Sequence, residues 1–99
     1  MSDEAQKDGV AQVRVKVYGV VQGVGFRFLG RHNARALGLT GWIRNCSDNS
    51  VETVAQGPPG AIDDFLAWLQ HGPSSARVDR IEPEWIDPPD DRFASFEAR

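Results

Sequence analysis

Three segments in the first part of the chain have the pattern of short strands. Over Val13–Tyr18, valines at every second position alternate with basic residues, which is the period of a strand with one buried face. Gly41–Cys46 and Ser50–Gln56 read as two further strands. The residues between them, Ser47–Asn49, favour a tight turn, because Asp and Asn bond nearby backbone and Asn tolerates a positive φ. The second and third strands are therefore predicted to form a hairpin.

A first helix is predicted after the glycine-bearing stretch Gly19–Gly25. Apolar or small residues recur at helical spacing from Phe26 to Leu37 and form one stripe, which includes Gly30. A second stripe consists of arginines: Arg27, Arg31 and Arg35. Gly38 is suited to end this helix. A glycine inside a helix costs about 1 kcal/mol relative to alanine, so we expect close backbone packing at Gly30.

A second helix is predicted to begin at Pro59 and to end at Gly72-Pro73. Its apolar stripe has the spacing i, i+3, i+4, i+7 and consists of Ile62, Phe65, Leu66 and Leu69. Such a stripe is typical of a helix packed on a core and not of a cofactor site. A fourth strand follows over Ala76–Trp85. Its apolar residues break strict alternation, which predicts a bulge, and Pro83 favours an edge position or the end of the strand.

The predicted order is strand, helix, strand, strand, helix, strand, with a short fifth segment around Phe93 and Phe96. Two interleaved right-handed strand–helix–strand units give a split βαβ arrangement. The fold class is therefore α+β: a two-layer, ferredoxin-like βαββαβ sandwich, with an antiparallel-rich sheet and two helices on one face. We expect residues 1–10 to form a flexible N-terminal tail and residues 11–99 to form a single domain.

The composition of this 99-residue chain, with 40% hydrophobic and 25% charged residues, is that of an ordinary globular protein. Its net charge of −3 argues against general nucleic-acid binding. Residues 1–50 contain seven Lys or Arg against four Asp or Glu, which suits a small anion, although an acidic second half alone would give the same contrast. We see no apolar run of membrane-spanning length and no secretory leader, so we expect no membrane partner and a cytoplasmic location.

The stretch between the first strand and the first helix has the features of an anion site. Successive backbone N–H groups in a glycine-permitted turn can converge on an anion, and the helix that follows adds its positive end. Arg27, in the first turn of that helix, offers a planar fork for two phosphate oxygens. The spacing fits neither the dinucleotide-binding glycine motif nor the nucleotide-binding P-loop. Taken alone, the glycines and the arginine would equally fit a tight turn with a solvated side chain.

The motifs of this chain resemble those of the acylphosphatase family. The resemblance rests on Val21–Arg27 (Val-Gln-Gly-Val-Gly-Phe-Arg), followed by Ala34, Leu37–Trp42 and Asn45, and later by Gln56-Gly57, Trp68-Leu69, Gly72-Pro73 and Ala76–Val78. It covers about Val13 to Trp85 in one register. It implies an enzyme that hydrolyses acyl phosphates to a carboxylate and inorganic phosphate, without a metal or other cofactor.

The resemblance implies that Arg27 binds the phosphate and that Asn45 orients the attacking water. The backbone cradle would consist of Gln22, Gly23, Val24, Gly25 and Phe26. A carboxylate leaving group needs no general acid, and phosphoryl transfer depends mainly on positioning and charge stabilisation. Asn45 is too weak a base to deprotonate water, so we infer that the phosphate of the substrate takes the proton. Without the resemblance, an asparagine before a turn would more often only cap a strand end.

Other functions are less well supported by the sequence. A phosphate-sensing module without turnover would need Arg27 but not Asn45. RNA binding on the sheet is disfavoured because the central strands lack aromatic residues before Tyr18. Cys46, His32 and His71 suggest neither a nucleophilic pair nor a metal site, and both histidines are expected at the surface. We expect a monomer whose partners are the small acyl phosphate and the phosphate product.

Overall fold

The computed structural model describes residues 9–90 and 93–99, so most of the predicted N-terminal tail lies outside the described residues. The elements follow the predicted order. They are β1 (Ala11–Val20), α2 (Phe26–Ala36), β2 (Thr40–Asn45), β3 (Val51–Gly57), α3 (Pro59–His71), β4 (Arg77–Trp85) and β5 (Phe96–Ala98). The predicted hairpin is present, although β2 ends at Asn45, one residue earlier than expected.

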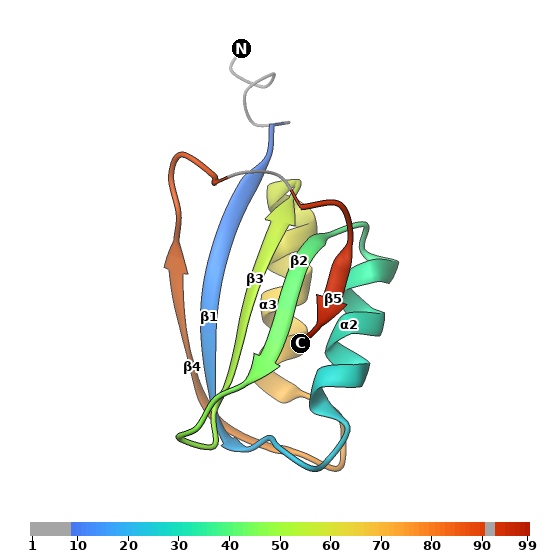
Figure 1. Ribbon diagram of the computed structural model, residues 1–99, viewed down its shortest axis with the longest axis vertical. Coiled ribbons are helices and arrows are strands. Elements are labelled where there is room, and N and C mark those ends of the chain that lie inside the picture. The colour runs from blue at the N-terminus through green and yellow to red at the C-terminus, as the bar shows by residue number, and fades with distance from the viewer. Residues whose placement is uncertain (1–8, 91–92) are drawn as a thin grey trace.

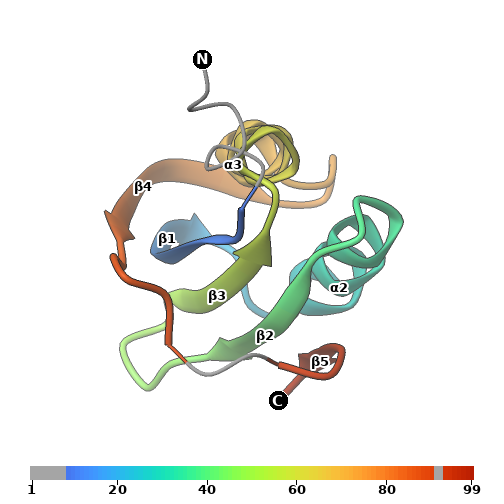
Figure 2. The same ribbon diagram turned by 90° about the horizontal axis from the view of Figure 1, so that it is seen from above.

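The strands form one sheet in the order β4-β1-β3-β2-β5. β1 pairs antiparallel with β3 and β4, and β2 pairs antiparallel with β3, while β5 runs parallel to β2. Both helices cover the same face of the sheet, and the other face is free of helices (Figures 1 and 2). The predicted α+β, ferredoxin-like two-layer sandwich is confirmed, and the fifth C-terminal segment is a strand.

The core lies between the sheet and the two helices and follows the predicted periodicity. The valines of β1 that alternate with polar residues, Val13, Val15 and Val17, are fully buried. Ile62, Phe65 and Leu69 of α3 are also fully buried, and Leu66 packs partly buried against the core. Because apolar burial contributes about 25 cal/mol per Å², this layer is the main source of stability and fixes the helices relative to the sheet.

Strand β4 is an edge strand with a bulge, as its sequence predicts. Tyr18 of β1 pairs with Arg80, but the next residue, Gly19, pairs with Val78, so Asp79 is the extra residue. The extra residue restores the phase between the two apolar positions of β4. Pro83 lies on this edge strand opposite Val15, where the missing N–H of proline is tolerated.

The arginine stripe of α2 lies along β5. Arg27 Nη1 donates to the carbonyl oxygen of Arg99 at 2.6 Å, and Arg35 Nε donates to the carbonyl oxygen of Phe96 at 3.0 Å. Arg31 instead lies over the ring of Phe28. Arg35 therefore binds the backbone of β5 and Arg27 binds the backbone directly after it. Among the described strands, β5 has one neighbour in the sheet, β2. The helical period predicts that the three arginines share one face of α2. What that face contacts is seen only in the folded structure.

Gly30 packs against the core, as expected for a glycine inside a helix. A Cβ at this position would lie 2.8 Å from Ile43 Cδ1 and 3.5 Å from Trp68 Cζ3. Ile43 is fully buried, so it has little room to move. The close approach of α2 to the sheet therefore depends on the missing side chain.

We predict that Gly30→Ala destabilises the fold by about 1 kcal/mol, because overpacking costs about 1–3 kcal/mol and outweighs the helix-propensity gain of about 1 kcal/mol. The matched control is Gly60→Ala in α3, where an added Cβ meets nothing within 4 Å; it should be neutral or stabilising. Urea unfolding of both variants measures the difference. An equal gain in stability in both would contradict the packing argument.

Candidate active site

The loop between β1 and α2 has a backbone suited to an anion. Gly23 and Gly25 have φ values of 76° and 80°, a region that residues with side chains rarely adopt. Among the described residues, no hydrogen bond is donated by the backbone N–H groups of residues 22–27. Gly25 is the N-cap of α2 and has no side-chain cap. The loop thus presents free N–H donors at the positive end of a helix.

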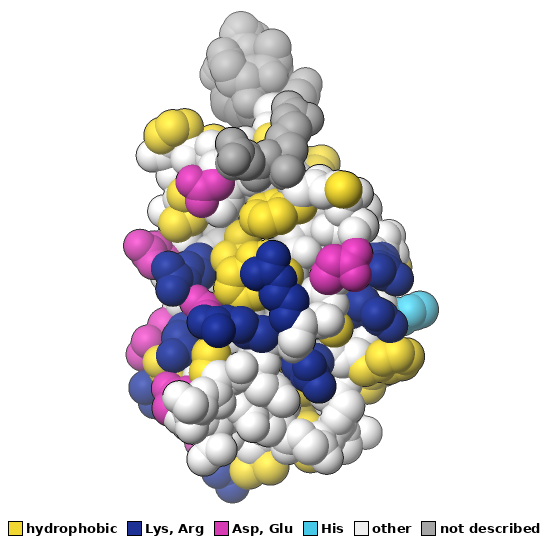
Figure 3. Space-filling view, viewed as in Figure 1, with side chains coloured by type: hydrophobic (Ala, Val, Ile, Leu, Met, Phe, Trp, Pro, Cys, Tyr) yellow, Lys and Arg dark blue, Asp and Glu magenta, His cyan; other side chains and the backbone are white. Residues whose placement is uncertain are grey.

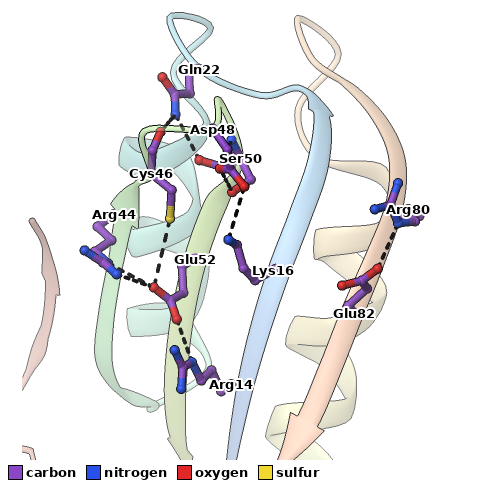
Figure 4. Close-up of polar contacts among 10 residues, drawn as sticks. All are labelled: Arg14, Lys16, Gln22, Arg44, Cys46, Asp48, Ser50, Glu52, Arg80 and Glu82. Atoms are coloured by element: carbon purple, nitrogen blue, oxygen red, sulfur yellow. Dashed lines mark hydrogen bonds and ion pairs between the residues drawn. The ribbon is translucent and has the colours of Figure 1, made fainter.

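The side chain of Gln22 fastens this loop to the β2–β3 hairpin. Its Nε2 donates to the carbonyl oxygen of Cys46 at 2.8 Å and to that of Ser50 at 2.9 Å. Figure 4 shows the carboxamide above the two ends of the hairpin turn. Both protons of one amide group are used, so the loop has a fixed position relative to the end of β2. Asn45 is the residue directly before Cys46 in the chain.

Asn45 is the last residue of β2 and pairs with Val51 through the strand backbone. It is exposed, and its side chain makes no hydrogen bond with another described residue. The adjoining turn is stabilised by other groups. Asp48 Oδ1 accepts from the backbone N–H of Ser50 at 3.1 Å, and Asn49 adopts the predicted positive φ of 73°. No hydrogen bond among the described residues therefore supports the alternative that the side chain of Asn45 only caps the end of the strand.

Arg27 is half-exposed and is held by the end of β5. Besides the bond from its guanidinium to Arg99, the backbone N–H of Arg99 donates to the carbonyl oxygen of Ile43 at 2.8 Å. Ile43 is two residues before Asn45 on β2. Arg27 and Asn45 are thus linked through Arg99 on one side and through the loop and Gln22 on the other. The guanidinium of Arg27 is thus partly exposed and has one hydrogen-bond partner in the chain.

Sequence reasoning missed two contributors to this arrangement. Gln22 was expected to act only through its backbone, and Arg99 was not expected near the loop. A glutamine that donates to two carbonyls leaves no periodic signal in a sequence. The contact with Arg99 joins residues 72 positions apart, and it depends on the parallel pairing of β5 with β2.

A buried carboxylate organises the basic residues beside Asn45 on the helix-free face. Arg14 Nε lies 2.6 Å from Glu52 Oε2, and Arg44 Nη2 lies 2.6 Å from Oε1 (Figure 4). Burial raises the pKa of Glu52, but the hydrogen bonds from Arg44 and Arg14 lower it overall. Glu52 is therefore ionised and fixes two guanidinium groups on the sheet.

The described residues contain no group of three or more His, Cys, Asp or Glu side chains that could hold a metal ion. His32 and His71 are exposed, as expected. Within the described part of the chain, neither helix is long and apolar enough to cross a membrane. The amide groups of the loop, the guanidinium of Arg27 and the carboxamide of Asn45 suit the binding of an anionic oxygen cluster.

The fold and this loop define a small α+β protein of the ferredoxin-like class. Its sequence matches the acylphosphatase family model over residues 13–98. An acylphosphatase from Burkholderia thailandensis is 46% identical over 97 residues, which cover 98% of each chain. One from Thermococcus kodakarensis is 43% identical over 77 residues, covering 78% of this chain and 85% of that one.

Solved structures agree with the sequence relatives. The structure of an acylphosphatase from Coxiella burnetii superposes with a TM-score of 0.87 and 35% identity, and each chain is fully covered. The protein therefore belongs to the acylphosphatase family. It is a hydrolase, and its reaction is the hydrolysis of acyl phosphates. The resemblance seen in the sequence is confirmed.

We predict that Gln22→Glu lowers kcat/KM for an acyl phosphate by about tenfold to a hundredfold, because the loop loses its fixed position. A carboxylate cannot donate to the two carbonyl oxygens, so stability should also fall by about 1–3 kcal/mol. Steady-state kinetics and urea unfolding measure the two effects. Gln70→Glu, at an exposed position on α3, is the matched control. An unchanged kcat/KM in Gln22→Glu would show that the loop does not depend on this side chain.

We predict a pH dependence of stability from Asp48 in the hairpin turn. Hydrogen bonds from the side chain and backbone of Ser50, and then from Lys16, lower the pKa of Asp48 from 3.8 to about 2. A lowered folded-state pKa adds stability that is present above the ordinary value and is lost as the pH falls through about 2.

This contribution can be measured by thermal unfolding at several pH values between 5 and 2. Asp48→Asn should show a smaller loss of melting temperature over that range than the unmodified protein. Asp63→Asn, at an exposed carboxylate on α3, serves as the control and should keep the original dependence. A parallel loss in Asp48→Asn would contradict the assignment.

Proposed function

We propose that Arg27 and the backbone N–H groups of residues 22–26 bind the phosphate of an acyl phosphate, and that Asn45 positions the water that attacks phosphorus. One observation carries the proposal above all. The free N–H groups of the loop and Arg27 are held, through Gln22 and Arg99, against the end of the strand that carries Asn45.

The loop supplies charge stabilisation without a charged side chain of its own. Its N–H groups lie at the N-terminus of α2, where the helix dipole adds positive potential. Donors that are already oriented need no rearrangement as charge develops on the phosphate oxygens, which is the principle of an oxyanion hole. The positive φ values of Gly23 and Gly25 are what allow successive N–H groups to point outward.

Arg27 complements the loop with a delocalised positive charge. A guanidinium has five N–H donors, and the bond to the Arg99 carbonyl oxygen occupies only part of this capacity. The remaining donors can bind two phosphate oxygens in the bidentate geometry that arginine favours. Because Nη1 of the guanidinium is already hydrogen-bonded, the side chain of Arg27 loses less conformational entropy when the phosphate binds.

Asn45 would act by orientation and not as a base. Its carboxamide oxygen can accept a hydrogen bond from water, but a carboxamide does not take a proton at neutral pH. The proton of the attacking water therefore passes to a phosphate oxygen of the substrate. Phosphorus–oxygen bond cleavage releases the acyl group as a stable carboxylate, so no general acid is needed.

We also propose that the enzyme works as a monomer in the cytoplasm, without a metal and without nucleic-acid partners. The absence of a metal from the chemistry follows from the leaving group, which needs neither protonation nor a Lewis acid. The net charge of −3 supports the expectation that nucleic acids do not bind.

We predict different effects for the two candidate catalytic residues, measured with acetyl phosphate in the presence of EDTA. Asn45→Ala should lower kcat by about a hundredfold or more and leave the inhibition constant of inorganic phosphate almost unchanged, because positioning contributes to the transition state. Arg27→Ala should weaken phosphate inhibition and lower kcat/KM together. Asn33→Ala on α2, away from the loop, is the control for asparagine.

Two results would contradict this division of roles. If Arg27→Ala left both phosphate inhibition and rate unchanged, the phosphate would bind elsewhere. If the unmodified protein bound phosphate but released none from acetyl phosphate in EDTA, the metal-free mechanism would be wrong.

A further inference from the structure

The helix-free face of the sheet has a depression next to Asn45. It has a volume of about 710 Å³, which lies within the range of small-molecule sites. Its lining combines apolar side chains with three arginines and two carboxylates: Trp42, Val54, Ile86 and Phe93, then Arg14, Arg44 and Arg99, then Glu52 and Asp90. Figure 3 shows this face, where Lys and Arg side chains gather around a hydrophobic patch at the centre of the sheet.

The depression joins the candidate active site at two residues. Asn45 belongs to its lining, and so does Arg99, whose carbonyl oxygen holds Arg27. The loop and Arg27 do not line it, so the depression extends away from the phosphate-binding groups onto the sheet. A substrate whose phosphate lies at Arg27 would therefore extend its acyl group past Asn45 toward Trp42.

The positive charge of the depression is not fully compensated by the described residues. Glu52 pairs with both Arg14 and Arg44, and Asp90 accepts a hydrogen bond from Gln12 Nε2 at 3.1 Å. Three arginines therefore face two carboxylates in the lining. The side chain of Arg99 forms no ion pair with any described residue. Its Cζ lies 4.8 Å from the ring centroid of Trp42, while that of Arg44 lies 5.6 Å from the same centroid. Trp42 therefore holds two guanidinium groups through cation–π contacts.

We propose that this depression binds the acyl group of the substrate and favours an acyl group that carries a second negative charge, with Arg99 as the residue that recognises it. The inference rests on the proposed function, because it takes the phosphate to lie at Arg27. Arg99 contacts the second anionic group, and Trp42 positions Arg99 and Arg44. The apolar floor formed by Val54 and Phe93 accommodates the carbon skeleton between the two charges.

A pair of substrates that differ by one negative charge tests the proposal. Benzoyl phosphate and 4-carboxybenzoyl phosphate share the phosphate and the ring and differ by one carboxylate. The measured quantity is the ratio of their kcat/KM values, carboxylated over neutral. This ratio cancels any effect on the phosphate that both substrates share, including any small displacement of Arg27. General attraction of the extra charge to the basic face does not cancel and is measured by the control variant below.

The unmodified protein should give a ratio above one, and Arg99→Gln should lower it about fivefold, the size of one exposed ion pair. Trp42→Leu should lower the ratio in the same direction by a smaller factor, because Arg99 and Arg44 lose their aromatic support. High salt should also bring the ratio of the unmodified protein toward one.

Arg80→Gln is the matched control, because Arg80 also lies over an aromatic ring, that of Tyr18 at 4.1 Å, but lies outside the depression. It should leave the ratio unchanged. A ratio of one or less in the unmodified protein, or an equal ratio in Arg99→Gln, would overturn the inference while hydrolysis of both substrates upheld the proposed function. If neither substrate nor acetyl phosphate were hydrolysed, the proposed function itself would fail.

Discussion

The arrangement of the site depends on one carboxamide, that of Gln22, which bonds the glycine loop to the carbonyl oxygens on both sides of the hairpin turn. A loop with free N–H groups has little internal stabilisation, because those groups are kept for a ligand. Its position has to be fixed from outside, and Gln22 does so where β2 ends with Asn45. Backbone donors and an orienting side chain from distant parts of the chain thereby share one rigid frame.

The short strand β5 provides the second half of this frame. It pairs with β2, its Phe96 accepts a hydrogen bond from Arg35 of α2, and Arg99, directly after it, accepts one from Arg27. The strand therefore joins the helix that carries the phosphate-binding candidate to the strand that carries Asn45. Arg99 has three contacts in this region: its N–H with Ile43, its carbonyl oxygen with Arg27, and its side chain with Trp42. Arg99 would thus take part in phosphate binding, through Arg27, and also in recognition of the acyl group.

Most of the fold could be predicted from periodicity and turn chemistry. The alternating valines of β1, the apolar stripe of α3, the bulge of β4 and the positive φ of Asn49 follow from local rules that the structure obeys. Arg27 and Asn45 were identified by the family motifs, and their roles are still predictions. What could not be predicted depends on contacts between distant segments: Gln22 with the hairpin, Arg99 with Arg27, and the depression on the helix-free face. Such contacts are set by strand register and leave no pattern in neighbouring residues.

The chemical nature of the groups around the loop has a consequence for the conditions under which the protein can work. Main-chain amides, guanidinium groups and carboxamides keep the same charge across the physiological range of pH. Within the described part of the chain, no histidine forms a hydrogen bond with the loop or with the end of β2. The charges that these groups place around the phosphate therefore do not change with pH in this range. Acidity would act on turnover only through the ionisation of the substrate and through the integrity of the sheet.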